Sequence, residues 1–144
     1  MADANPTPPP PLARPLPRPD IYVETTPFWE AAKEHRLLLQ YDTEVGKFQW
    51  FPRPVSIYTG RRTLEWREAS GRGKLYSWTL SNVAWPGHAD RVPYMCAFVD
   101  LEEGVRMQGN LYNYEGVDLR NGLPVKLVWE TLSEEFEYPA FEPA

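Results

Sequence analysis

Two histidines and one cysteine are the residues of this chain that could act as a general base and a nucleophile. His88 and Cys96 could form a catalytic pair, because such pairs assemble in the fold from distant sequence positions. Cys96 lies in the apolar run 94–99, which is typical of a strand buried on both faces, where a free cysteine is a small hydrophobic residue. His35 lies on a predicted helix, with no second histidine near it in sequence. We therefore expect no catalytic residue, and keep a small independent enzyme that uses His88 as an alternative.

Two acidic pairs are the other candidates for acid–base chemistry. They are Glu102–Glu103 and Glu134–Glu135, and both lie in predicted turns. A carboxylate that acts as an acid or base near neutral pH needs burial to shift its pKa, and a turn does not provide it. We interpret these pairs as turn and solubility charges.

Composition limits the class of protein. The net charge of −5 and the pI of about 5.1 count against nucleic-acid binding as the main role, since that draws on basic surface. A single cysteine excludes an internal disulfide framework and a thiolate zinc site. No run of about 18 apolar residues predicts a transmembrane span, and the N-terminus lacks the apolar core of a secretory signal. We expect a soluble cytoplasmic protein.

The N-terminal half is predicted to hold one helix and three strands. Eight of the 16 prolines fall within residues 1–19, which predicts a disordered tail. Thr25-Thr26-Pro27 predicts a helix start with a threonine cap, and the helix should run over about 27–36. The strands that follow are expected at 37–41, 48–51 and 63–69.

The C-terminal half is predicted to form a small antiparallel barrel. Three strands should follow one another at 74–83, 92–101 and 105–112, with a tight turn at Glu102-Glu103-Gly104. Gly71 and Gly73 precede the first of these strands and allow it to bend sharply. A helical turn is expected at 115–119, and strands at 125–131 and, as a short edge strand, 136–141.

The ordered set of these pieces resembles the DUF35 family over roughly residues 27–141. The segments that carry the resemblance are PFWE to LLLQ at 27–40, FPRP at 51–54, SGRGKLYSWT at 70–79, PY at 93–94 with VDLEEG at 99–104, and GLPV at 122–125. The resemblance implies a mainly β chain, with an N-terminal helix and a rubredoxin-like ribbon followed by a five-stranded OB-fold barrel. The expected divisions are a tail over 1–19, the helix and ribbon over 20–69, and the OB-fold over 70–144.

The family's ribbon carries two Cys-x-x-Cys knuckles that hold zinc, and this chain departs from that pattern. Aligned on Gln40, Gly46, the FPRP segment and Gly60, the four cysteine positions hold Asp42, Val45, Ser56 and Thr59. The spacing is kept but the thiolates are lost, and a tetrahedral zinc site needs strong sulfur or imidazole donors. We expect a metal-free ribbon that is kept as a docking surface. Hydrophobic contacts should replace the metal, from Phe48, Trp50, Phe51, Ile57 and Tyr58.

The resemblance further implies an accessory subunit in acyl-CoA metabolism, which is not catalytic alone. The implied partner in a heteromeric complex is a thiolase-like enzyme, a lipid-transfer-protein-type aldolase or a MaoC-type hydratase. The implied ligand is a coenzyme A thioester. We expect cations to bind its phosphates and an indole to stack on its adenine. The candidate residues are Arg72, Lys74, His88 and Arg91 as cations, and Trp78 or Trp85 as the stacking ring.

A single-stranded nucleic-acid-binding OB-fold is the alternative function. Its bases would stack on aromatic side chains, of which the chain has many, with six tryptophans among them. The acidic net charge weighs against this alternative.

Overall fold

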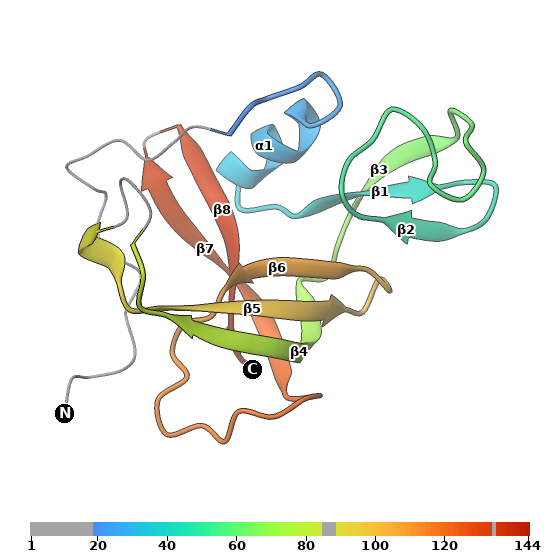
Figure 1. The fold of residues 1–144 in the computed structure, drawn as a ribbon. Coiled ribbons are helices and arrows are strands. Elements are labelled where there is room, and N and C mark those ends of the chain that lie inside the picture. The colour runs from blue at the N-terminus through green and yellow to red at the C-terminus, as the bar shows by residue number, and fades with distance from the viewer. Residues whose placement is uncertain (1–18, 85–88, 134) are drawn as a thin grey trace.

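The computed structural model describes residues 19–84, 89–133 and 135–144. The described chain is mainly β, with a single α-helix near its start (Figure 1). The elements are α1 (Thr26–Lys33), β1 (Leu38–Asp42), β2 (Lys47–Gln49), β3 (Leu64–Glu68), β4 (Arg72–Ser81), the 3-10 turn η1 (Ala89–Arg91), β5 (Tyr94–Leu101), β6 (Arg106–Asn110), β7 (Pro124–Ser133) and β8 (Phe136–Pro143).

Strands β4 to β8 form the predicted barrel. Their order in the sheet is β6-β5-β4-β7-β8, and every neighbouring pair is antiparallel. The two edges meet at a parallel bridge between Leu111, which follows β6, and Phe141 in β8. The backbone N–H of Tyr112 donates to the carbonyl of Phe141 there, at 2.8 Å. The result is the nearly closed five-stranded barrel expected of an OB-fold.

The bend of β4 depends on glycine and on a bulge. The register of β4 against β5 shifts between Leu75 and Ser77, as in a β-bulge. Gly73 lies so close to β5 that a Cβ there would be 2.6 Å from the carbonyl oxygen of Asp100. Gly73 therefore permits the close approach of two backbones, which is a second reason for a glycine at this position.

The N-terminal half packs on the barrel rather than standing apart from it. Its three strands form a separate sheet in the order β2-β1-β3, and α1 packs against β8. Phe28 of α1 and Leu39 of β1 belong to the same apolar cluster as Val99 and Phe141 of the barrel. The ribbon, the helix and the barrel thus share one hydrophobic core.

The start and end of α1 differ from the prediction. The helix ends at Lys33, three residues earlier than expected. Thr25 stands at the N-cap position, but its hydroxyl makes no capping bond to the helix. Instead it accepts from the N–H of Tyr22 at 3.0 Å and donates to the carbonyl of Tyr22 at 3.1 Å. The side chain of Thr25 therefore stabilises the turn before the helix.

Other predictions in the barrel were wrong in whole or in part. Burial alternates along β5, and the side chain of Phe98 is 42% exposed, so this strand is not buried on both faces. Cys96 is only partly buried. The expected helical turn at 115–119 is a single hydrogen-bonded turn, with Val117 N–H donating to the Tyr114 carbonyl at 3.1 Å. The last strand lies at the edge of the sheet order, as predicted, but it is not short, because β8 pairs with β7 along eight residues and meets Leu111 at the closing bridge.

Some predictions fall on residues that the structure does not describe. They concern the proline-rich tail up to residue 18, Trp85, His88 and Glu134. Among the residues that are described, no helix has the length and apolar character needed to cross a membrane.

Candidate functional site

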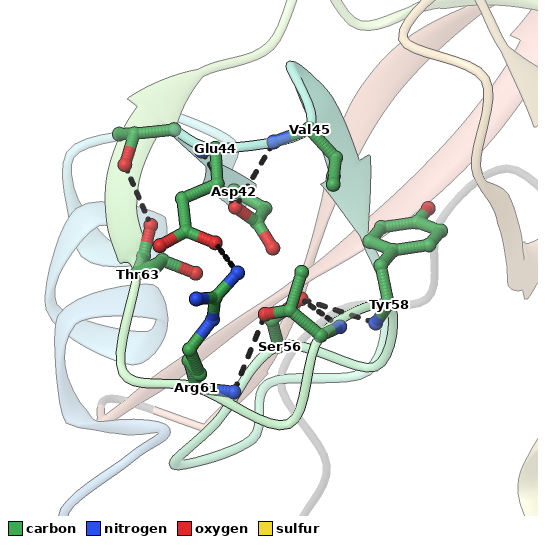
Figure 2. A network of polar contacts seen from close by, with 9 residues as sticks. Asp42, Glu44, Val45, Ser56, Tyr58, Arg61 and Thr63 are labelled. Carbon is green, nitrogen blue, oxygen red and sulfur yellow. Dashed lines mark hydrogen bonds and ion pairs between the residues drawn. The ribbon is translucent and has the colours of Figure 1, made fainter.

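The first knuckle of the ribbon is organised by Asp42. This buried side chain lies at the end of β1, and its Oδ1 accepts hydrogen bonds from the N–H groups of Glu44 at 2.8 Å and Val45 at 3.4 Å (Figure 2). The turn is closed by the N–H of Gly46, which donates to the Asp42 carbonyl at 2.8 Å. The Asp42 side chain therefore accepts from the backbone N–H groups of the two residues at the tip of the turn.

The second knuckle repeats this geometry around Ser56. The buried Oγ of Ser56 accepts from the N–H groups of Tyr58 at 3.0 Å and Thr59 at 3.2 Å. The N–H of Gly60 donates to the Ser56 carbonyl at 2.9 Å. Asp42 and Ser56 thus have equivalent roles, because in each turn the side-chain oxygen accepts the N–H groups of the residues two and three positions further along the chain.

Polar contacts also tie the two halves of the ribbon together. Glu44 of the first turn forms an ion pair with Arg61, which follows the second (Figure 2). The hydroxyl of Thr43 donates to the carbonyl of Thr63 at 3.1 Å.

Burial raises the pKa of Asp42, but hydrogen bonds from the Ser56 hydroxyl and the Glu44 amide outweigh it and hold the pKa below its usual value. The carboxylate form is the one that this network stabilises.

The four knuckle side chains do not fit a zinc ion. Val45 has no donor atom, and its side chain is 40% exposed. Asp42 is one carboxylate, and hydroxyls such as those of Ser56 and Thr59 are weak zinc ligands beside thiolate and imidazole. No cluster of three or more His, Cys, Asp or Glu side chains suited to a metal ion occurs in the part of the chain that the structure describes.

Two of the predicted coenzyme A contacts, Arg72 and Lys74, line a hollow of about 530 Å³ at the start of β4. The side chain of Arg72 is exposed and paired with Glu102, with Nη2 and Oε2 2.8 Å apart. This ion pair raises the pKa of Arg72 and lowers that of Glu102. Lys74 is exposed. Asp100 and Glu102 line the same hollow, so its two cationic side chains lie beside carboxylates.

Trp78 lines a second, smaller hollow of about 150 Å³ between β4, β5 and β6. Phe98 and Cys96 lie along the same hollow, and burial raises the pKa of the Cys96 thiol. A thiol with a raised pKa is a poor nucleophile near neutral pH. Gln108 of β6 also lines the Trp78 hollow.

A third hollow, of about 320 Å³, is a cleft between the N-terminal half and the barrel, and we call it the aromatic cleft. It lies between α1, the segment 50–52 after β2, and strands β6, β7 and β8. Its lining is mainly apolar, with aromatic side chains from Phe28, Trp29, Trp50, Phe51 and Tyr138. Gln108 lines this cleft as well as the Trp78 hollow, so the two adjoin.

A buried ion pair forms the polar part of the aromatic cleft. The side chains of Arg91 and Glu130 are 5% and 3% exposed and contact one another. Asn110 completes the group, because its Nδ2 donates to Glu130 Oε2 at 2.9 Å. Burial lowers the pKa of Arg91. Arg91 is therefore neutralised by Glu130 rather than presented to solvent as a free cation.

The structure does not gather the predicted coenzyme A contacts into one site. Arg72 and Lys74 share one hollow, Trp78 lines the second and Arg91 the third, while Trp85 and His88 lie outside the described residues. The aromatic cleft was missed in the sequence. Its residues are far apart along the chain, and the only available signal was an unusual number of aromatic residues on either side of the FPRP segment.

Comparisons with known proteins agree with this architecture. The family described as the C-terminal OB-fold domain of ChsH2 matches residues 66–130. A chain in the solved structure of an Ltp2-ChsH2(DUF35) aldolase superposes with a TM-score of 0.77 at 32% identity, covering 88% of this chain and 98% of that one.

Two kinds of relative are similar in sequence. A probable enoyl-CoA hydratase alpha subunit of Thermomonospora curvata is 33% identical over 128 residues, which cover 89% of this chain but 40% of the relative. A DUF35 domain-containing scaffold protein of Pyrococcus furiosus is 28% identical over 112 residues, with 78% and 82% of the two chains covered. The chain thus spans well under half the length of the hydratase subunit and most of the scaffold protein.

Proposed function

The chain belongs to the DUF35 family, and we propose that it is an accessory subunit that binds a hydratase or aldolase partner in acyl-CoA metabolism. One observation carries this proposal: the chain matches 98% of a chain found in an Ltp2-ChsH2(DUF35) aldolase. The hydratase alpha subunit among its relatives supports the same kind of partner.

The ribbon supplies a surface suited to a partner. Phe51, Ile57 and Tyr58 are large hydrophobic side chains that are half exposed on it. Exposed aromatic and aliphatic side chains of this size are typical of the centres of protein interfaces. We propose that this surface docks on a thiolase-like or MaoC-like subunit.

The ribbon is further proposed to need no metal. Support comes from Asp42 and Ser56, whose oxygens accept the backbone N–H groups of the knuckles. In a zinc knuckle a structural metal provides much of the folding free energy. Here the hydrogen bonds, the Glu44–Arg61 ion pair and the shared core provide that stabilisation instead.

A coenzyme A thioester is the proposed ligand. Arg72 and Lys74 offer cations for phosphate groups in one hollow, which Asp100 and Glu102 also line, and Trp78 offers a half-exposed ring in a separate hollow on which a base could stack. A cytoplasmic location is proposed on the same grounds, since acyl-CoA chemistry of this kind takes place where coenzyme A is available.

The test is co-expression with the proteins encoded by the neighbouring genes, among which we expect a thiolase-like or MaoC-like subunit. We expect a complex that co-elutes in size-exclusion chromatography, and no thioester-cleaving activity of the isolated chain. Ile57→Glu should weaken the complex at least tenfold, while Val83→Glu, at an exposed apolar residue of the barrel, serves as the matched control. A stand-alone active monomer, or the absence of any complex, would contradict the proposal.

A further inference from the structure

The aromatic cleft is formed where the three parts of the protein meet. Its walls come from α1, from the segment 50–52 and from β8, and its floor from β6 and β7. The walls are held by ring contacts: Trp29 packs edge-on against Tyr138 at 5.1 Å, and Phe28 packs against Trp50 at 5.1 Å between ring centroids. The cleft is thus preformed, because the rings that line it are fixed by one another and by the shared core.

The electrostatics of the cleft exclude a phosphate and favour an uncharged group. Its one described cation, Arg91, is paired with Glu130, and Asn110 occupies the other oxygen of that carboxylate. An anion would have to separate a buried ion pair, which leaves a carboxylate unpaired in a site of low dielectric. An apolar group would only displace water from aromatic surfaces, which is favourable.

The volume sets the size of the occupant. About 320 Å³ lies at the lower end of the range of ligand pockets. It is the space of roughly ten water molecules, which suits an acyl chain of medium length or a small ring system. It does not suit a whole coenzyme A molecule.

The position of the cleft connects it with the proposed ligand. Gln108 lines both the cleft and the Trp78 hollow, so a ligand could extend from one into the other. Gln108 is an exposed residue. It can donate to a carbonyl oxygen and accept from an amide N–H, the two groups found around a thioester and its pantetheine arm.

We propose that the aromatic cleft binds the apolar acyl group of a thioester, with Gln108 at the passage to the Trp78 hollow. This inference rests on the proposed function, because it assigns one part of the acyl-CoA to this chain. It predicts that affinity grows with the length of the acyl group. It also predicts that the acyl group binds without the nucleotide.

The test uses thioesters that lack the nucleotide. Octanoyl-N-acetylcysteamine and acetyl-N-acetylcysteamine are titrated into the full chain, and binding is measured by calorimetry and by NMR chemical shifts. We expect the octanoyl ester to bind at least about tenfold more tightly, since each buried methylene adds to the transfer free energy. The shifted resonances should include the indole N–H groups of Trp29 and Trp50.

Two variants locate the site. Phe51→Ala removes a ring from the wall and is expected to weaken octanoyl binding about fivefold or more; Phe51 is 51% exposed, so the fold should tolerate the change. Gln108→Trp fills the passage and should weaken binding as well. Val45→Ala is the matched control, because Val45 is a 40% exposed apolar residue of the ribbon that does not line the cleft.

The outcomes separate the inference from the proposed function. Equal affinity for the two esters, or octanoyl binding that Phe51→Ala and Gln108→Trp leave unchanged, overturns the acyl site. Octanoyl-CoA and acetyl-CoA are titrated in parallel into the chain and into its complex with the partner. If these bind equally, the proposed function stands and the cleft assignment falls. If no CoA ester binds to either, both fall.

Discussion

The imidazole of His35 lies parallel to the indole of Trp129, with ring centroids 5.5 Å apart and an angle of 8° between the rings. His35 Nε2 is also 3.4 Å from Glu137 Oε2. The stacked pair joins the end of α1 to β7. To make it, His35 adopts a left-handed backbone with φ of 56°.

This backbone conformation makes residue 35 sensitive to the shape of its side chain. His35→Asn and His35→Val both remove the stacked ring, but asparagine tolerates the left-handed region and a β-branched residue does not. We expect the valine variant to be less stable than the asparagine variant by about 1–2 kcal/mol. Thermal unfolding of the two variants measures this difference, and equal midpoints would contradict it.

Asp42 should couple the stability of the ribbon to pH. Its pKa is lower in the folded chain than in the unfolded chain, so its contribution is complete above the unfolded pKa of about 3.9 and is lost as the pH falls through the folded pKa. Asp42→Asn should therefore have a lower free energy of unfolding than the wild type at pH 6. This difference in the free energy of unfolding should become smaller below about pH 4. Asp118→Asn, at an exposed side chain, is the control and should show no such difference. A difference that widens in acid would contradict the assignment.

The knuckle backbones should accept zinc if cysteines are restored. The variant D42C/V45C/S56C/T59C places four thiolates on two turns that already have the hydrogen-bonding geometry of a knuckle. We expect it to bind one Co²⁺ per chain, with a thiolate-to-cobalt absorption band, and to be stabilised by Zn²⁺. The unfolding midpoint of the wild type should not change with Zn²⁺ or with a chelator. The V45C/T59C variant is the control, because two thiolates cannot complete a tetrahedral site.

The effects of substitutions at Arg91 and Glu130 on the free energy of unfolding should be strongly non-additive. Arg91→Met leaves the Glu130 carboxylate buried without a counterion, which typically costs about 3–5 kcal/mol. Replacement of both residues in Arg91→Met/Glu130→Leu should restore most of that stability. Chemical denaturation of the two single variants and the double variant measures the coupling. Additive losses would mean that the two charges do not depend on one another.

Gly73→Ala should destabilise the barrel. Its Cβ would meet the Asp100 carbonyl oxygen and Val99 Cγ1, both at 2.6 Å, and the carbonyl belongs to the backbone of a paired strand. Overpacking of this kind costs about 1–3 kcal/mol or more. Ser77→Ala, elsewhere in β4, is the control and should change stability by less than about 0.5 kcal/mol. A Gly73 variant as stable as the control would show that β5 can move away.

Several strands of the barrel were predictable because a glycine or proline bounds the apolar run, as Gly71 and Pro124 do for β4 and β7. The burial of β5 was misread, since Cys96 and Phe98 are apolar residues on its outward face and conceal the alternation. The aromatic cleft could not be read from the sequence at all. Trp29 and Tyr138 meet only because α1 packs against β8, and that packing depends on tertiary contacts rather than on local pattern.

The shared hydrophobic core has a practical consequence for anyone who wishes to study the halves of this protein separately. Leu37 and Leu39 of the ribbon side are almost fully buried, in the same cluster as barrel residues. Cutting the chain near Ser70 would expose a large apolar surface to solvent on each fragment. The halves should therefore unfold cooperatively, in one transition, and fragments made separately should aggregate unless they are produced together.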